Sequence, residues 1–142
     1  MSSIDAQNLP LTEHHTRYEA IDPATTLKGS VAGKVLFITG ASRGIGRATA
    51  LAFAEAGAKA VYLTARSQAE LEATRDLVRQ TNPDTLCTFS ICDVTRPEQV
   101  QAAVADCVQA FGAIDVADAN AGYLAPWKKI GESDPASYWH TW

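Results

Sequence analysis

A short apolar run that leads directly into a glycine-rich turn constrains the fold of this chain more than any other feature. The run extends from Val35 to Ile38, and the turn from Gly40 to Gly46 has the spacing Gly-x-x-x-Gly-x-Gly. A continuous apolar run of this length is typical of a strand buried on both faces, as in a parallel sheet. An alanine-rich stretch follows the turn and stops near Gly57, which is typical of a helix. The pattern predicts a strand, a tight turn and a helix.

Apolar runs and helical patterns go on alternating along the rest of the chain. Further strands are expected at 59–65, 86–91 and 113–119, with helical patterns between them. Strands separated by helices are joined by right-handed crossovers and lie parallel. The sequence therefore predicts an α/β fold, a Rossmann-type doubly wound parallel sheet over 33–142, preceded by an irregular N-terminal arm over 1–32.

Two of the expected helices begin with the pattern of a capping box, in which Ser or Thr is followed three residues later by Glu. The pattern occurs at Ser67–Glu70 and at Thr95–Glu98, and it predicts Ser67 and Thr95 as N-caps. A further helix is expected to begin at Ser133–Pro135. The helix after Thr95 carries apolar side chains at helical spacing, which predicts one buried face. These side chains are Val100, Ala103, Val104, Cys107, Val108 and Phe111.

Composition and charge narrow the range of partners. The 142 residues carry a formal net charge of −4 with no block of like charges, so we expect neither nucleic acid nor a membrane as a partner. No apolar stretch approaches the ~20 residues that cross a bilayer, and the start lacks the regions of a secretory signal. The three cysteines form no Cys-x-x-Cys pair, which favours a reducing, cytoplasmic location. Because His14, His15 and His140 lack ligand spacing, no metal site is expected.

The glycine-rich turn has the properties of an anion site. Gly40 permits the positive φ of a sharp turn, while Gly44 and Gly46 lack a Cβ, so that backbone amides can approach a pyrophosphate. The helix N-terminus adds unpaired N–H groups and the positive end of a dipole. The turn is not a P-loop, because neither Lys-Ser nor Lys-Thr follows the glycines. The alternative is a helix start whose glycines serve tight packing.

Three spaced motifs together resemble the short-chain dehydrogenases/reductases. The stretch Thr39–Gly46 is similar to the cofactor motif of that family, Asp93–Val94 to its Asp-Val pair, and Asn120–Gly122 to its Asn-Asn-Ala-Gly motif. The resemblance covers about residues 33–142 and implies the strand order 3-2-1-4, truncated after about four strands. A fourth strand without its next neighbour would leave an exposed edge, so we expect the isolated chain to be marginally stable or prone to aggregation.

The resemblance implies that a nicotinamide dinucleotide is bound. The glycine turn would hold the pyrophosphate, Asp93 and Val94 would contact the adenine, and Asn120–Gly122 would line the ribose side. The alternatives are a helix-entry role for Asp93 and a simple strand-ending turn at Asn120–Gly122. The residues expected at the cofactor are Gly40, Ser42, Arg43, Gly44, Ile45, Gly46, Arg66, Asp93, Val94, Asn120, Ala121 and Gly122.

The end of the second expected strand bears on which cofactor is bound. A carboxylate there would bond the ribose 2′-hydroxyl and repel a 2′-phosphate, but the strand ends without one and Arg66 follows. A guanidinium can pair with a phosphate through two hydrogen bonds, and Arg43 can approach from the turn. In the family such a basic pair usually accompanies NADP. We expect NADP(H) rather than NAD(H), with two solvated arginines as the alternative.

The catalytic residues of the family have no match in this chain. The family uses a Tyr-x-x-x-Lys pair and an upstream Ser for proton transfer beside hydride transfer. Four residues after the four tyrosines stand Asp22, Arg66, Trp127 and Trp142, none of them Lys. No catalytic residue is therefore assigned, and the chain alone is expected to be inactive. Ala119 also replaces the first Asn of the family motif, and Asp118 is a charged residue in an expected core strand.

Three hypotheses for the function follow. The first is the NADP(H)-binding half of an oxidoreductase that acts on an alcohol or carbonyl compound, with a small-molecule substrate only in a full-length form. The second is a dinucleotide-binding module without catalysis, and the third is a fragment without function. The substrate and the oligomeric state are left open.

Overall fold

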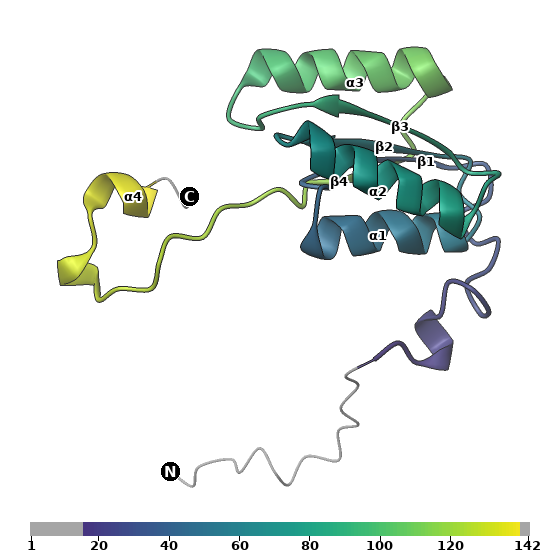
Figure 1. Ribbon diagram of the computed structural model, residues 1–142, viewed down its shortest axis with the longest axis horizontal. Coiled ribbons are helices and arrows are strands. Elements are labelled where there is room, and N and C mark those ends of the chain that lie inside the picture. Colours follow the sequence, from purple (N-terminus) through teal and green to yellow (C-terminus); the bar gives the residue numbers. More distant parts are fainter. Residues whose placement is uncertain (1–15, 140–142) are drawn as a thin grey trace, which may run out of the picture.

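Four parallel strands form the centre of the fold, in the order β3-β2-β1-β4 (Figure 1). The computed structural model describes residues 16–139. The strands are β1 (Val35–Thr39), β2 (Ala60–Ala65), β3 (Leu86–Ile91) and β4 (Val116–Asp118). The α/β class and the strand order predicted from the sequence are confirmed. In the described part of the chain, β4 pairs with β1 and with no other strand.

Helices cover both faces of this sheet. Figure 1 shows α1 (Gly44–Glu55) and α2 (Gln68–Thr81) on one face and α3 (Pro97–Phe111) on the other. After β4 the chain runs away from the sheet and forms the short helices η3 (Ile130–Glu132) and α4 (Pro135–Trp139). No helix among the described residues is long and apolar enough to cross a membrane.

The side chains of the central strands alternate between two buried clusters. Leu36 and Ile38 of β1 pack on the side of α1 and α2, whereas Val35 and Phe37 face α3. Tyr62 of β2 joins the second cluster, and its ring stacks on that of Phe37 with the centroids 5.6 Å apart. Because both faces are covered, the run that begins at Val35 is apolar throughout rather than alternating.

The two predicted helix starts have different outcomes. The hydroxyl of Ser67 accepts a hydrogen bond from the Glu70 amide at 3.5 Å, as predicted. The prediction for Thr95 is wrong, because the N-cap of α3 is Arg96, which makes no side-chain capping bond. Pro97 occupies the first helical position and forces the preceding residue into an extended conformation. Thr95 therefore lies one residue too early to cap the helix.

The apolar face predicted for α3 is only half correct. Ala103 and Cys107 are buried, but Val104 and Val108 are 38% and 43% exposed. The helix packs mainly on β1 and β2, so it buries a narrow stripe. No other element of the described residues covers the rest of the predicted face. The pattern identified the helix but overestimated the surface that packs against it.

The part of the N-terminal arm that the structure describes lies against the end of α1. It contains a single turn of 3-10 helix, η2 (Glu19–Ile21). Arg17 forms an ion pair with Glu55, and the Gly29 amide donates to the Ala56 carbonyl at 2.8 Å. Residues 1–15, and the predictions for His14, His15 and His140, lie outside the described residues.

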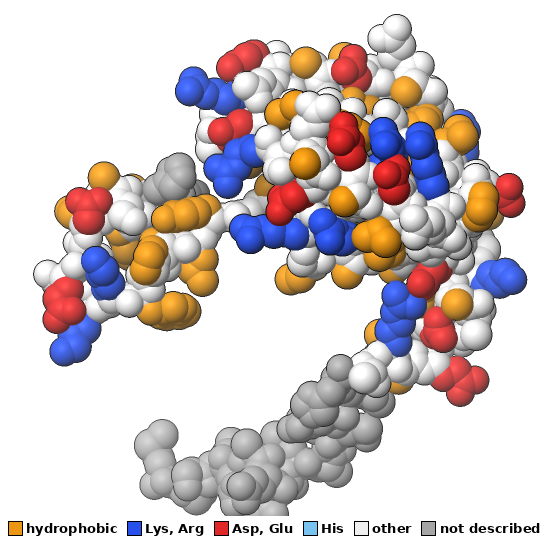
Figure 2. Space-filling model, in the orientation of Figure 1, with side chains coloured by type: hydrophobic (Ala, Val, Ile, Leu, Met, Phe, Trp, Pro, Cys, Tyr) orange, Lys and Arg blue, Asp and Glu red, His pale blue; other side chains and the backbone are white. Residues whose placement is uncertain are grey.

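The segment after β4 exposes large apolar side chains (Figure 2). Trp127 is 90% exposed, and Leu124, Ile130 and Trp139 are also largely open to solvent. The helix predicted at Ser133–Pro135 is present as α4, with the Asp134 carboxylate accepting from the Ser137 amide at 2.8 Å.

Candidate functional site

A cavity of about 840 Å³ opens where the four strands end, beside the N-terminus of α1. Ligands of open α/β sheets bind at the carboxyl ends of the strands, and cavities that hold small ligands measure ~300–1,000 Å³. Of the twelve residues that the sequence singled out, all except Gly46 line this cavity. The topology of the sheet therefore brings together motifs that lie far apart in the sequence, from Gly40 to Gly122.

The glycine turn between β1 and α1 requires its glycines for different reasons. Gly40 has a φ of +67°, and a Cβ there would lie 2.9 Å from the Ala121 Cα. Gly44 has a φ of +56° with open space around it, so glycine is favoured there by the backbone conformation and not by a lack of room. Gly46 is buried under the turn, where a Cβ would lie 2.4 Å from the Gly40 carbonyl oxygen. Its missing side chain therefore lets the turn fold onto the helix rather than opening the cavity.

The carboxamide of Asn120 joins the end of β4 to the glycine turn. Its Nδ2 donates to the carbonyl oxygens of Thr39 at 2.9 Å and Gly40 at 3.3 Å. In return, the hydroxyl of Thr39 accepts from the Ala121 amide at 3.0 Å. The side chain of Asn120 thus shapes the turn while the residue lines the cavity.

Charged side chains gather at the end of the cavity formed by the turn and β2. Arg43 and Arg66 both line the cavity and are exposed. Glu70, in the first turn of α2, lines it as well. Two guanidinium groups and the Glu70 carboxylate thus lie at this part of the cavity, and the charge of Arg66 also acts on the carboxylate of Asp93, which lines the same cavity.

The carboxylate of Asp93 closes a tight turn after β3. One of its oxygens accepts from the amide of Thr95 at 3.0 Å and from the Thr95 hydroxyl at 2.8 Å. These bonds, with smaller contributions from the charges of Arg66 and Arg96, lower the pKa of Asp93 below its ordinary value. Asp93 is thus ionised at neutral pH, and it both lines the cavity and shapes the entry to α3.

Several residues of the site escaped the sequence analysis. All but Glu70 are direct neighbours of predicted residues, and Glu70 follows Arg66 by four positions, so short extensions of each motif would have found them. Among them Cys92 is buried, and burial raises the pKa of its thiol. The additional lining residues are Ala65, Ser67, Glu70, Cys92, Thr95 and Tyr123. In the described residues, no three His, Cys, Asp or Glu side chains gather as they would around a metal ion.

Comparison with known proteins places these features in a family. The family model described as short chain dehydrogenase matches residues 34–141. A short chain dehydrogenase of Monascus purpureus is 38% identical over 132 residues, which is 91% of this chain but 44% of that protein. The chain thus spans less than half the length of the curated relatives that it matches.

Solved structures give the same picture. Levodione reductase superposes with a TM-score of 0.74 at 34% identity, covering 78% of this chain and 42% of that one. NAD⁺-bound xylitol dehydrogenase superposes with a TM-score of 0.74 at 33% identity and the same coverage of both chains. The alignment with both is confined to less than half of each larger protein.

Proposed function

Because the chain belongs to the short chain dehydrogenase family, we propose that its cavity binds a nicotinamide dinucleotide. The observation that carries the proposal is the convergence of the glycine turn, Asp93 and Asn120–Gly122 on one cavity of suitable size. A relative of similar fold is described as NAD⁺-bound. The positive end of α1 beside the turn supports the binding of a pyrophosphate there.

Each part of the cavity has a proposed contact with the cofactor. The backbone amides of the glycine turn after Gly40, including those of Gly44 and Ile45, would donate hydrogen bonds to the pyrophosphate. The Asp93 carboxylate would accept from the adenine amino group through the oxygen that the Thr95 bonds leave available, with Val94 beside the ring. Asn120–Gly122 would line the ribose. When bound, the cofactor supplies or accepts the hydride.

We propose NADP(H) as the preferred cofactor. Arg43 and Arg66 at one end of the cavity provide the charge for a 2′-phosphate. The carboxylates of Glu70 and Asp93 line the same cavity and oppose this preference, so the preference depends on the 2′-phosphate binding closer to the two guanidinium groups than to either carboxylate. Titration of the full chain with NADPH and with NADH, followed by nucleotide fluorescence, tests this; tighter binding of NADH would contradict it.

We further propose that this chain supplies the cofactor half of an oxidoreductase acting on an alcohol or carbonyl compound. The 142 residues contain no Tyr-x-x-x-Lys pair, and in the family this pair transfers the proton that accompanies the hydride. Hydride transfer would then need residues outside these 142. The chain with NADP⁺ and a panel of small alcohols is expected to show no reduction above background, whereas NADPH binding should saturate. Reduction by this chain would contradict the division of roles, and failure to saturate at millimolar NADPH would contradict cofactor binding.

A further inference from the structure

The carbonyl oxygen of Ser42, in the middle of the glycine turn, is held by side chains from two helices. Arg47 of α1 donates to it through Nη2, and the Oγ1 of Thr74 on α2 lies 3.3 Å from it. Arg47 also donates through Nε to the Oγ1 of Thr74 at 3.0 Å. The three groups form a closed triangle behind the turn. No short motif in the sequence predicted it, because Thr74 lies 27 residues from Arg47.

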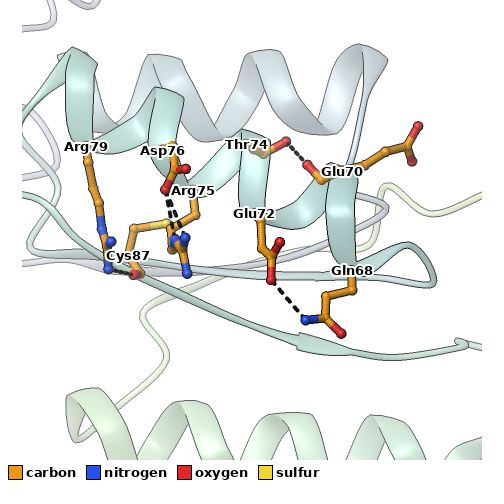
Figure 3. A network of polar contacts seen from close by, with 8 residues as sticks. All are labelled: Gln68, Glu70, Glu72, Thr74, Arg75, Asp76, Arg79 and Cys87. Carbon is orange, nitrogen blue, oxygen red and sulfur yellow. Dashed lines mark hydrogen bonds and ion pairs between the residues drawn. The ribbon is translucent and has the colours of Figure 1, made fainter.

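The hydroxyl of Thr74 has two carbonyl oxygens within reach of its single proton. A threonine hydroxyl carries one proton and two lone pairs. Thr74 Oγ1 accepts from Arg47 and lies 3.0 Å from the Glu70 carbonyl, the contact drawn in Figure 3. With its single proton shared between the carbonyls of Glu70 and Ser42, Thr74 is a part-time donor to the turn. Arg47 is therefore the main group that binds the Ser42 carbonyl.

The positive charge of Arg47 is not neutralised by an acidic side chain. Within the part of the chain that the structure describes, no carboxylate lies within 4.0 Å of its guanidinium. Its side-chain hydrogen bonds go to the neutral oxygens of Ser42 and Thr74. The side chain is half-buried in the first turn of α1. Its charge thus adds to the positive end of the helix dipole on the side of the glycine turn.

The direction of the Ser42 carbonyl decides which groups face the cavity. Neither Arg47 nor Thr74 lines the cavity, and Thr74 is fully buried. A carbonyl bound to these side chains points toward α1 and α2. A carbonyl turned into the cavity would instead present a partial negative charge to an anionic ligand. The Arg47 bond therefore keeps an unfavourable dipole away from the place proposed for the pyrophosphate.

We propose that Arg47, supported by Thr74, is a positioning residue for dinucleotide binding. By holding the Ser42 carbonyl behind the turn, it orients the amides of Arg43–Ile45 toward the pyrophosphate and adds an unpaired positive charge behind them. This inference rests on the proposed function. It predicts equal effects on NADPH and NADH, because both carry the same pyrophosphate.

The test compares Arg47→Met with a matched control in the full chain. Arg79 of α2 makes the same kind of contact, donating through Nη2 to the Cys87 carbonyl at 3.4 Å (Figure 3). Unlike the glycine turn, Arg79 is not part of the lining of the cavity. Arg47→Met is expected to weaken NADPH and NADH binding about tenfold each. Arg79→Met is expected to leave both dissociation constants unchanged, although both variants lose an arginine-to-carbonyl bond.

A second measurement separates positioning from general loss of stability. Inorganic pyrophosphate is titrated into the wild type and each variant while the backbone amide NMR signals of Gly44 and Ile45 are followed. In Arg47→Met these signals should shift already in the ligand-free chain, and pyrophosphate should bind about tenfold more weakly. In Arg79→Met both should remain as in the wild type. Arg47→Lys keeps the positive charge but lacks the planar guanidinium that bonds two acceptors at once. Its affinity for pyrophosphate should fall about threefold, which lies between the wild type and Arg47→Met.

The outcomes distinguish this inference from the proposed function. A wild-type chain that binds neither dinucleotide would overturn the proposed function and this inference with it. Binding by Arg47→Met equal to that of a binding wild type would overturn the inference alone, as would an equal loss in Arg79→Met. If Arg47→Met does not fold, Arg47→Lys decides, and wild-type affinity in that variant would also overturn the positioning role.

Discussion

A Cβ at Gly46 would lie 2.4 Å from the carbonyl oxygen of Gly40. The helix α1 and the turn before it approach each other so closely that even one methyl group has no room. The side-chain Nδ2 of Asn120 also occupies this space and would lie 2.6 Å from the same Cβ. The third glycine of the motif is therefore required for the turn to fold back onto its own helix.

Replacing Gly46 by alanine should destabilise the chain through this overlap. Because the nearest atom belongs to the backbone, the turn must shift, and overpacking of this kind costs about 1–3 kcal/mol in the free energy of unfolding. Urea denaturation measures the loss. Gly122→Ala is the matched control, since a Cβ there meets nothing closer than 4.0 Å and the φ of Gly122 is not positive. Equal stability of the two variants would contradict the geometry of the turn.

Replacing Arg66 by alanine should weaken NADPH binding while leaving NADH binding nearly unchanged. A hydrogen bond between charged groups contributes ~1.5–3 kcal/mol, which corresponds to a loss of about tenfold or more. Fluorescence titration with each nucleotide measures the effect. Arg75→Ala is the control, because Arg75 lies on α2 outside the cavity and pairs with Asp76. Unchanged NADPH affinity in Arg66→Ala would remove the role proposed for this side chain.

The pKa of Asp93 should rise when Thr95 is replaced by valine. The lowered pKa arises first from the Thr95 amide and then from the Thr95 hydroxyl, and the valine removes only the second bond, so the rise should be partial. Ionised Asp93 stabilises the fold above the ordinary pKa of ~3.9, and that stabilisation disappears as the pH falls through the lowered pKa. The variant should therefore be less stable than the wild type at neutral pH and equal to it in strong acid. A ¹³C NMR titration of the Asp93 carboxylate measures the shift, and an unchanged midpoint would contradict the cause given for it.

The regular parts of the fold could be predicted from short stretches of sequence because their causes are local. The apolar run from Val35 and the glycine spacing after it determine the strand, the turn and the place of the cavity. The prediction of Thr95 as an N-cap is wrong because the capping-box pattern does not take account of Pro97. This proline, two residues later, determines where α3 begins. The predicted burial of Val104 and Val108 is wrong because helical spacing shows which side of a helix is apolar. It does not show how wide a surface packs against that side.

The contacts behind the turn could not be predicted in this way, because they join distant segments. Arg47 and Thr74 each look ordinary in their own helix, and only the packing of α1 against α2 brings them to the Ser42 carbonyl. The same holds for Asn120, whose role as a link between β4 and the turn depends on the parallel pairing of β4 with β1. Sequence motifs locate the residues that face a ligand more readily than those that hold them in place.

Replacing Asn120 by aspartate should destabilise the chain more than replacing it by alanine. Asn120 donates from one nitrogen to the carbonyls of Thr39 and Gly40. Alanine removes the donor and lets water reach those carbonyls, whereas aspartate, nearly the same in shape, places a charged acceptor against two other acceptors. Loss of a partly buried donor costs about 1–3 kcal/mol, and the repulsion in Asn120→Asp adds to it. Urea denaturation at neutral pH ranks the wild type and the two variants by their free energy of unfolding. In acid, the protonated aspartate can donate a hydrogen bond again, so the difference in stability between Asn120→Asp and Asn120→Ala should narrow. An aspartate variant as stable as the wild type at neutral pH would show that the carboxamide does not hold the turn through its nitrogen.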